Sequence, residues 1–159
     1  MSTSDPNGEP ITAQGLTALK AELGELETVA RREIAARILT ARGHGDLKEN
    51  GEYHAAKEDQ ALLETRILRL RQRLRGAVVV AAETSGDVFS FARPAEIRDE
   101  GTGEVNVWTV VGPTEADRKA GKLSAESPIA RALLDHRVGE TVEVPTPRGT
   151  RRLTIVRMV

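Results

Sequence analysis

Cysteine is absent from this 159-residue chain, which excludes disulfides and thiolate metal sites. Aromatic residues make up only 3% of it, which argues against a stacking platform for single-stranded nucleic acid. No run of about 18 apolar residues occurs, so we expect no membrane span. The start, Met1–Pro6, is polar and lacks the apolar region of a signal peptide. We therefore expect residues 1–10 to be a disordered tail and the protein to be cytoplasmic.

A strong net charge is also lacking, because 23 basic residues are set against 24 acidic ones. The chain therefore lacks the excess positive charge with which a protein binds nucleic acid on its own. Its 39% hydrophobic content suffices for one or two small domains with a large solvated surface. One stretch is strongly basic, and we interpret it mainly as the solvated flank of a helix: Arg66, Arg69, Arg71, Arg73 and Arg75.

Two long helical patterns occupy residues 11–76. The apolar positions in each recur at steps of three and four residues, and in the second the alternation is strict, which is typical of a coiled-coil seam. Thr12 is the expected N-cap of the first helix, but Gly15 occupies the position at which a capping box needs Glu or Gln. The first stripe is Leu16, Leu19, Leu23, Leu26, Ala30, Ile34, Ile38 and Ala41; the second is Tyr53, Ala56, Gln60, Leu63, Ile67, Leu70 and Leu74.

A joint of about ten residues between helices of similar length favours an antiparallel hairpin. The first helix, of about 30 residues, would be roughly 45 Å long. An ordinary helical bundle is the alternative, but the rest of the chain offers no helices of that length to complete one. Gly76 is the expected stop.

After Gly76 the pattern changes to that of strands. Residues 77–82, 104–111, 141–144 and 152–156 are apolar or alternating, and Pro147–Gly149 supplies a turn. A short helix is expected at 127–134, with Ser127 as N-cap and Pro128 in the first position. The sequence therefore predicts an α+β protein whose residues 77–159 form a twisted antiparallel sheet with one short helix on a face.

The segment that joins the two helices, residues 42–58, carries the chemistry. Asp46 and Glu49 lie three residues apart in a glycine-punctuated turn. Two carboxylates are too few for a magnesium cage, but they can complete a Mg²⁺ site that a partner supplies. The common alternative is a solvated turn whose charges serve solubility.

Other side chains beside the turn support weaker hypotheses. His44 and His54 flank it, but a zinc site needs a third ligand, and no zinc motif is present. Arg42 and Lys57, on opposite arms, are suited to phosphate contacts or to ordinary pairing with nearby glutamates. We interpret Tyr53 as a packing residue.

The stretch Gly45–Glu58 resembles the signature of bacterial Gre-type transcript cleavage factors and is closest to the GreA branch of that family. The match falls between two coiled-coil arms, as in the family. It extends upstream through Ile11–Leu16, and downstream through Val110–Gly112, Glu115–Asp117 and Ser127–Leu134, so that it covers nearly the whole chain.

The resemblance implies a protein that is not itself an enzyme. Gre factors insert the coiled coil into the secondary channel of bacterial RNA polymerase and stimulate its hydrolysis of backtracked RNA. Asp46 and Glu49 would help hold a second Mg²⁺ and its water there, and Arg42 and Lys57 would contact the RNA 3′ segment.

By the same resemblance, residues 77–159 would have an FKBP-like fold. This domain would dock on a coiled coil of the largest polymerase subunit through Glu126, Ser127 and Pro128. The factor would act as a monomer.

The sequence departs from the family pattern at four positions. Gly51 stands where alanine is more common, and Gly43 adds a second glycine beside the turn. Ala92 follows Phe91 where the family usually has glycine, and Asp135 replaces a glycine at the end of the short helix.

Two other functions stay open at this point. A Gre-like protein that occupies the channel without supporting cleavage would be an inhibitor; the retained Asp46 and Glu49 argue against it, whereas the glycines at 43 and 51 keep it possible. A peptidyl-prolyl isomerase would need an aromatic-lined pocket, for which the chain has few residues.

Overall fold

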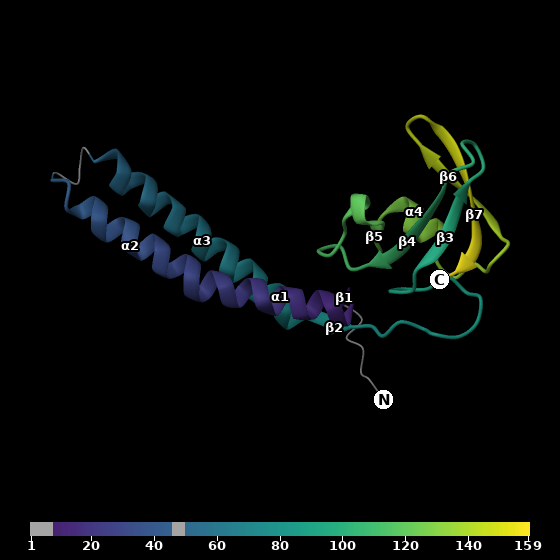
Figure 1. Ribbon diagram of the computed structural model, residues 1–159, viewed down its shortest axis with the longest axis horizontal. Coiled ribbons are helices and arrows are strands. Elements are labelled where there is room, and N and C mark those ends of the chain that lie inside the picture. The colour runs from purple at the N-terminus through teal and green to yellow at the C-terminus, as the bar shows by residue number, and fades with distance from the viewer. Residues whose placement is uncertain (1–7, 46–49) are drawn as a thin grey trace. The chain divides into compact units, whose positions relative to one another are not determined.

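The computed structural model describes residues 8–45 and 50–159, which form two compact units (Figure 1). One unit is helical and comprises residues 16–77. The other is globular and combines, among the described residues, 8–15 with 78–159. Within the described ranges, no helix is long and apolar enough to cross a membrane.

Two antiparallel arms form the helical unit. The first arm runs through α1 (Ala13–Glu25), a π-helical turn (Leu26–Ala30) and α2 (Arg31–Arg42). The second arm is α3 (Gly51–Gly76), and Figure 1 shows it lying along α2. Every predicted seam position is buried or half-buried, which confirms the hairpin. The buried positions are Leu19, Leu23, Ile38, Ala41, Ala56, Leu63, Ile67 and Leu70.

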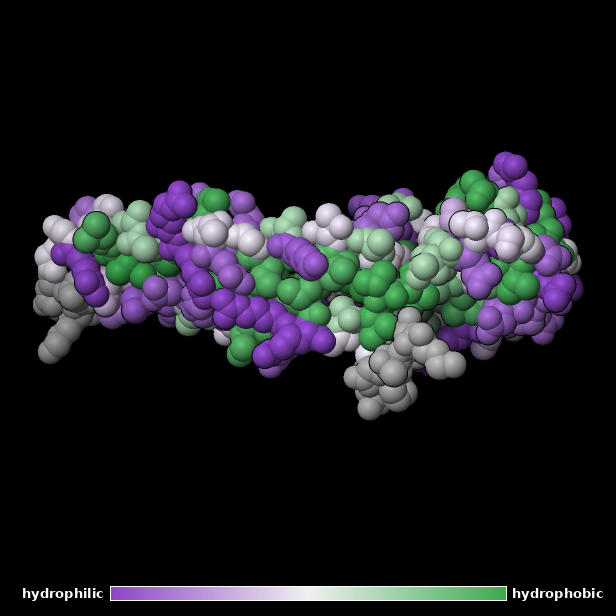
Figure 2. All heavy atoms as spheres, turned by 90° about the horizontal axis from the view of Figure 1, so that it is seen from below, coloured by the Kyte–Doolittle hydropathy of each residue, from purple (hydrophilic) through white to green (hydrophobic). Residues whose placement is uncertain are grey.

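Ion pairs flank the seam and link the two arms. Arg31 donates to Glu64 at 2.8 Å, and the hydrogen bond from this guanidinium lowers the pKa of the Glu64 carboxyl. Further pairs join Arg37 to Asp59, Arg66 to Glu22 and Arg71 to Glu27. Figure 2 shows long hydrophilic side chains lying across the hairpin, with apolar surface between them. Since these pairs are exposed, they add little stability, and their main effect is on register.

The π turn compensates for an irregular spacing of the apolar residues in the first arm. A strict heptad alternates steps of three and four, but the steps from Leu26 to Ile38 are all four, one residue more than the alternation needs. Residues Leu26–Ala30 lie at the start of this stretch, and their π-helical bonds reach one residue further than α-helical ones. The turn therefore takes up the extra residue and keeps Ile38 and Ala41 in the seam.

In the globular unit, five strands form one sheet in the order β5-β4-β3-β7-β6. These are β3 (Ala95–Asp99), β4 (Val105–Val111), β5 (Lys122–Ser124), β6 (Thr141–Thr146) and β7 (Gly149–Met158). A 3₁₀ turn, Arg118–Ala120, precedes β5, and α4 (Pro128–Leu133) packs against β5 and β6. A separate two-stranded sheet pairs β1 (Glu9–Ile11) with β2 (Ala77–Val79).

The structure differs from the sequence prediction in four places. The strand predicted at 77–82 ends at Val79, and it pairs with β1 outside the main sheet. Strand β3 was not predicted, because three of its five residues are charged and only Ala95 and Ile97 are buried. Strand β5 pairs with β4 in parallel, so one edge of the sheet is not antiparallel. Glu9 and Pro10, assigned to the tail, lie in β1 because Ile11 is buried there and its carbonyl accepts from Val80 N at 3.0 Å.

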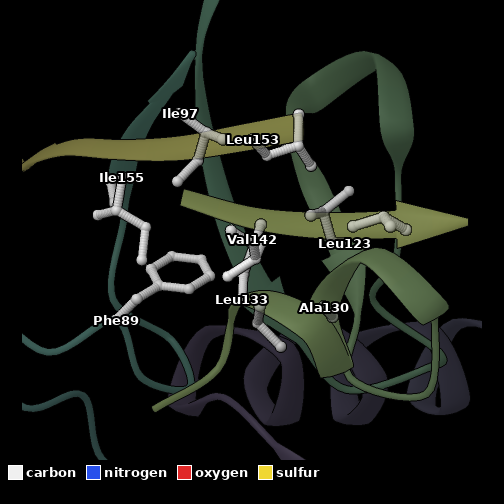
Figure 3. Packing of buried hydrophobic residues seen from close by; sticks show 11 residues of the cluster. Phe89, Ile97, Leu123, Ala130, Leu133, Val142, Leu153 and Ile155 are labelled. Carbon is white, nitrogen blue, oxygen red and sulfur yellow. The ribbon is translucent and has the colours of Figure 1, made fainter. Parts of the chain in front are cut away.

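One hydrophobic core fills the space between the sheet and α4. Figure 3 shows the Phe89 ring beside Ile155, Val142 and Leu133, where strand and helix side chains meet. Phe89 is fully buried, and its backbone N donates to His136 O at 2.8 Å. The buried cluster comprises Phe89, Ala95, Ile97, Val110, Leu123, Ala130, Leu133, Val142, Val144, Leu153 and Ile155.

The two family departures in this unit fall on left-handed backbone. Ala92 has φ 66° and Asp135, just after α4, has φ 68°. A side chain at such a φ is strained, whereas glycine adopts it freely. The glycine preference that the resemblance implies at both positions therefore has a local steric cause.

We predict that Ile67→Ala lowers the free energy of unfolding by about 2–5 kcal/mol, because it empties a buried seam position. Ile67 is 1% exposed. Leu62, on the same helix, is 69% exposed, so Leu62→Ala should change stability by no more than about 0.5 kcal/mol. Thermal unfolding followed by the helical circular dichroism signal distinguishes them; equal melting curves would show that the seam is wrongly assigned.

Candidate functional site

The described residues at the end of the hairpin form a frame around the segment 46–49. Helix α2 ends at Arg42, with Gly43 as its C-cap, and Gly45 has φ 107°, which favours glycine. Helix α3 begins at Gly51. The predicted metal-binding residues Asp46 and Glu49 lie outside the described residues.

Asn50 joins the two sides. Its Oδ1 accepts from Tyr53 N at 3.1 Å and so caps α3. Its Nδ2 donates to the carbonyl of Ala41, on the opposite arm, at 2.5 Å. We call these two bonds the Asn50 bridge. One side chain thus satisfies an unpaired amide at the start of α3 and gives a second donor to the carbonyl of Ala41, which also accepts from His44 N at 3.1 Å.

Small side chains let the arms approach behind the bridge. Ala41 is 3% exposed and Ala56 is 1% exposed, so both are fully within the seam. Both alanines belong to the predicted seam, whereas Asn50 was not predicted. Its signal was present, since an asparagine directly before a helical pattern is a typical N-cap. The bond to the other arm could not have been found without the hairpin register.

The predicted RNA-contacting residues stand on either side of the frame. Arg42 is exposed as the last residue of α2. Lys57 is exposed on α3, and its Nζ donates to Gln60 Oε1 at 3.0 Å rather than to the glutamates considered above.

No zinc site forms among the described residues. His44 Nε2 lies 3.7 Å from Glu52 Oε2, and the His54 ring meets the Tyr53 ring edge-on. In residues 8–45 and 50–159, no three histidine, aspartate or glutamate side chains come together as metal ligands would.

The predicted docking residues lie together where α4 begins. The Ser127 hydroxyl accepts from Ala130 N at 3.2 Å and donates to Ser124 O at 2.7 Å, so it serves as the predicted N-cap. Pro128 occupies the first helical position and is exposed, as is Glu126 beside it. Because the hydroxyl of Ser127 is already used, Glu126 and Pro128 are the groups of this corner that face solvent.

Ser127 and Pro128 also line a cleft of about 1340 Å³ in the globular unit. Leu123, Ile129 and Val144 give it apolar surface, and residues 145–150, where β6 turns into β7, form part of its lining. The charged residues that line it are Asp99, Glu100, Glu104, Arg118, Lys122, Arg148, Arg151 and Arg152.

Arg151 and Asp99 fix part of the cleft lining. The Arg151 guanidinium donates to Asp99 Oδ2 through Nε and Nη2, and it lies 6.0 Å from the Trp108 ring centroid. These bonds, followed by the one from Gly101 N, lower the pKa of Asp99. A lowered carboxyl pKa means that this contribution to stability is present above the ordinary pKa of aspartate and is lost as the pH falls through the folded-state value.

Comparison with known proteins identifies both parts of the chain. A family model described as "Transcription elongation factor, N-terminal" matches residues 9–79, and one described as "Transcription elongation factor, GreA/GreB, C-term" matches residues 83–158. The transcription elongation factor GreA of Azorhizobium caulinodans is 46% identical over 150 residues, which cover 94% of this chain and 96% of that protein. GreA of Geobacillus kaustophilus is 44% identical over 148 residues, which cover 92% and 94%.

Solved structures resemble the chain as well. GreA factor homolog 1 (Gfh1) of Thermus thermophilus is 30% identical and matches 96% of this chain and 99% of its own, with a TM-score of 0.42.

We predict that Asn50→Ala destabilises the hairpin by about 0.5–2 kcal/mol through loss of the cap alone. Asn50→Asp is the matched variant, because it keeps an acceptor for Tyr53 N but replaces the donor to Ala41 with a second carboxylate oxygen. Amide hydrogen exchange should therefore show Tyr53 N–H protected in Asn50→Asp and unprotected in Asn50→Ala. Equal protection of Tyr53 in wild type and Asn50→Ala would show that the bridge is absent in solution.

Proposed function

The chain belongs to the GreA/GreB family of transcription elongation factors, and we propose from this premise that its hairpin enters the secondary channel of a bacterial RNA polymerase. There it stimulates the polymerase's own hydrolysis of backtracked RNA, and the chain supplies groups to that active centre without being a catalyst by itself. The partner, the channel and the cleavage are carried over from the family.

The observation that carries the proposal is the Asn50 bridge at the end of a two-helix arm. Asn50 ties the start of α3 to Ala41, so the described residues that precede and follow the segment 46–49 are hydrogen-bonded to each other. Acidic residues in the segment that joins two such arms could be carried into a site that the globular unit does not enter. A solubility turn would not need its two ends hydrogen-bonded to each other.

Asp46 and Glu49 are the residues we assign to Mg²⁺ in the polymerase centre. Carboxylate oxygens suit Mg²⁺, which commonly takes one or two protein carboxylates and keeps its remaining positions for water and phosphate. When bound, the ion would orient and acidify a water molecule. Arg42 and Lys57 would contact phosphates of the RNA 3′ segment, since both are exposed beside the same frame.

Docking is assigned to the corner at the start of α4. Exposed Glu126 offers a carboxylate to a basic residue of the partner, and Pro128 offers a rigid apolar surface beside the cleft. A helical coiled coil of the largest polymerase subunit is the partner that the family implies.

We predict that Asp46→Asn and Glu49→Gln each remove most of the cleavage stimulation. Both substitutions delete a charge with little change of shape, and the loss should lie in transition-state stabilisation through the metal. The assay is shortening of RNA in stalled, backtracked elongation complexes at saturating factor. Glu33→Gln, an exposed acid on α2, is the control and should act as wild type.

Full stimulation by Asp46→Asn or Glu49→Gln would contradict the metal role of that residue. A wild-type protein that binds the polymerase and blocks RNA synthesis without shortening the RNA would establish the inhibitory alternative.

For docking, we predict that Glu126→Arg raises the dose needed for half-maximal stimulation and leaves the plateau unchanged. The reversed charge opposes binding, while the hairpin end is untouched. Glu83→Arg, an equally charge-reversing change at another exposed position of the globular unit, should leave the dose unchanged. Superimposable titrations of Glu126→Arg and wild type would remove this corner from the interface, and a lowered plateau would place Glu126 in the chemistry instead.

A further inference from the structure

Glu115 makes a set of hydrogen bonds that neither the seam nor the core explains. It follows β4 in the loop 112–117, and its carboxylate reaches the start of α1, 103 residues away in sequence. Oε2 accepts from Thr12 N at 3.0 Å and from Gly112 N at 3.1 Å. Oε1 accepts from the Thr12 hydroxyl. One carboxylate therefore receives three donors, two of them from Thr12.

Thr12 links the Glu115 carboxylate to the first turn of α1. Its hydroxyl gives its hydrogen to Glu115 and accepts from Gly15 N at 2.9 Å, so one oxygen is both a donor and the N-cap acceptor of α1. Thr12 is 6% exposed, which makes these bonds costly to leave unmade. A carboxylate beside a helix N-terminus is also favoured by the helix dipole.

Two glycines make room for this arrangement. A Cβ at position 15 would overlap the Glu115 carboxylate, and a Cβ at position 112 would overlap the carbonyl of Pro10. Neither glycine has a positive φ, so backbone conformation does not require either one. Glycine at position 15 lowers the helix propensity of the first turn of α1. The close approach of the Glu115 carboxylate explains why a glycine is present there.

These contacts place the first turn of α1 in the globular unit. Residues 8–15 group with 78–159, whereas α1 from Leu16 onward groups with the hairpin. Helix α1 is continuous across this boundary, and the contact between Glu115 and Thr12 lies on the globular side of it. The β1–β2 pair adds a second attachment through Ile11 and Val80.

We propose that Glu115 is a positioning residue: by holding Thr12 at the root of α1, it fixes the arm whose far end carries Asp46 and Glu49. This role rests on the proposed function, in which the globular unit docks and the hairpin end acts. Small displacements of reacting groups are costly in rate, so a loosened root should lower the yield of productive complexes without weakening docking.

The first experiment is a titration of backtracked elongation complexes with wild type, Glu115→Ala, Glu115→Gln and Gly15→Ala. Glu115→Ala and Gly15→Ala should lower the cleavage plateau several-fold and leave the half-maximal dose close to wild type. Glu115→Gln keeps one oxygen for the Thr12 and Gly112 amides, so it should recover part of the plateau. If Glu115 only stabilised the fold, the variants would not lower the cleavage plateau while leaving the half-maximal dose unchanged.

Gly24→Ala is the matched control for Gly15→Ala. It makes the same substitution in the same helix, but a Cβ at position 24 meets no atom within 4 Å. Gly24→Ala should keep the wild-type plateau and raise the melting temperature. In a Glu115→Ala background, Gly15→Ala should cause no further loss, because the carboxylate that it displaces is already gone.

Amide hydrogen exchange on the free protein tests the contact without the polymerase. Thr12 and Gly112 amides should lose protection in Glu115→Ala, while core amides of β7 keep theirs. Unchanged exchange at Thr12, or a wild-type plateau in a Glu115→Ala protein that has lost that protection, would overturn the proposal. If the wild-type protein fails to shorten RNA, the proposed function fails and the positioning role fails with it, whereas loss of Thr12 protection in the variant would still establish the contact.

Discussion

The apolar seam between the two arms is the interaction on which the rest of this molecule depends. A helix of this length has little reason to persist alone in water, because most helical stability in proteins comes from packing of an apolar face. Here each arm supplies the other with that face, from Leu19 and Leu70 at one end to Ala41 and Ala56 at the other. The side chains in the seam become smaller toward the far end, where they are the alanines Ala41 and Ala56. The two helices can therefore approach closely where Asn50 connects them.

Burial sets the pairing of the arms, but directional bonds define their two ends. At the far end, Asn50 spans from α3 to the carbonyl of Ala41. At the root, Glu115 holds the N-cap residue Thr12. In both places a single polar side chain does two tasks, satisfying a helix terminus and attaching it to another part of the chain.

Much of this could be predicted from the sequence, and the misses have physical causes. The seam, the Thr12 N-cap and the Ser127–Pro128 helix start are local patterns, which is why spacing and residue type sufficed for them. Strand β3 was missed because its short run carries three charged residues, and parallel β5 because pairing partners are not encoded locally. The contact of Glu115 with Thr12 could not be predicted from the sequence, since the two residues lie 103 positions apart. Ala92 and Asp135 stood out as departures from a family pattern, but their positive φ explains them only once the backbone is known.

The π turn accommodates one extra residue in the first arm. Its position determines where the length of the arm can change without loss of the seam. A single-residue deletion between Leu26 and Ile34 lets the arm revert to continuous α-helix with both stretches still facing α3. The same deletion elsewhere in the arm rotates everything on one side of it by about 100° and turns apolar residues toward water. Among relatives whose arms differ by one residue, the insertion or deletion should accordingly be found in this short window. The hairpin can thus gain or lose length in evolution without passing through a form whose seam is broken.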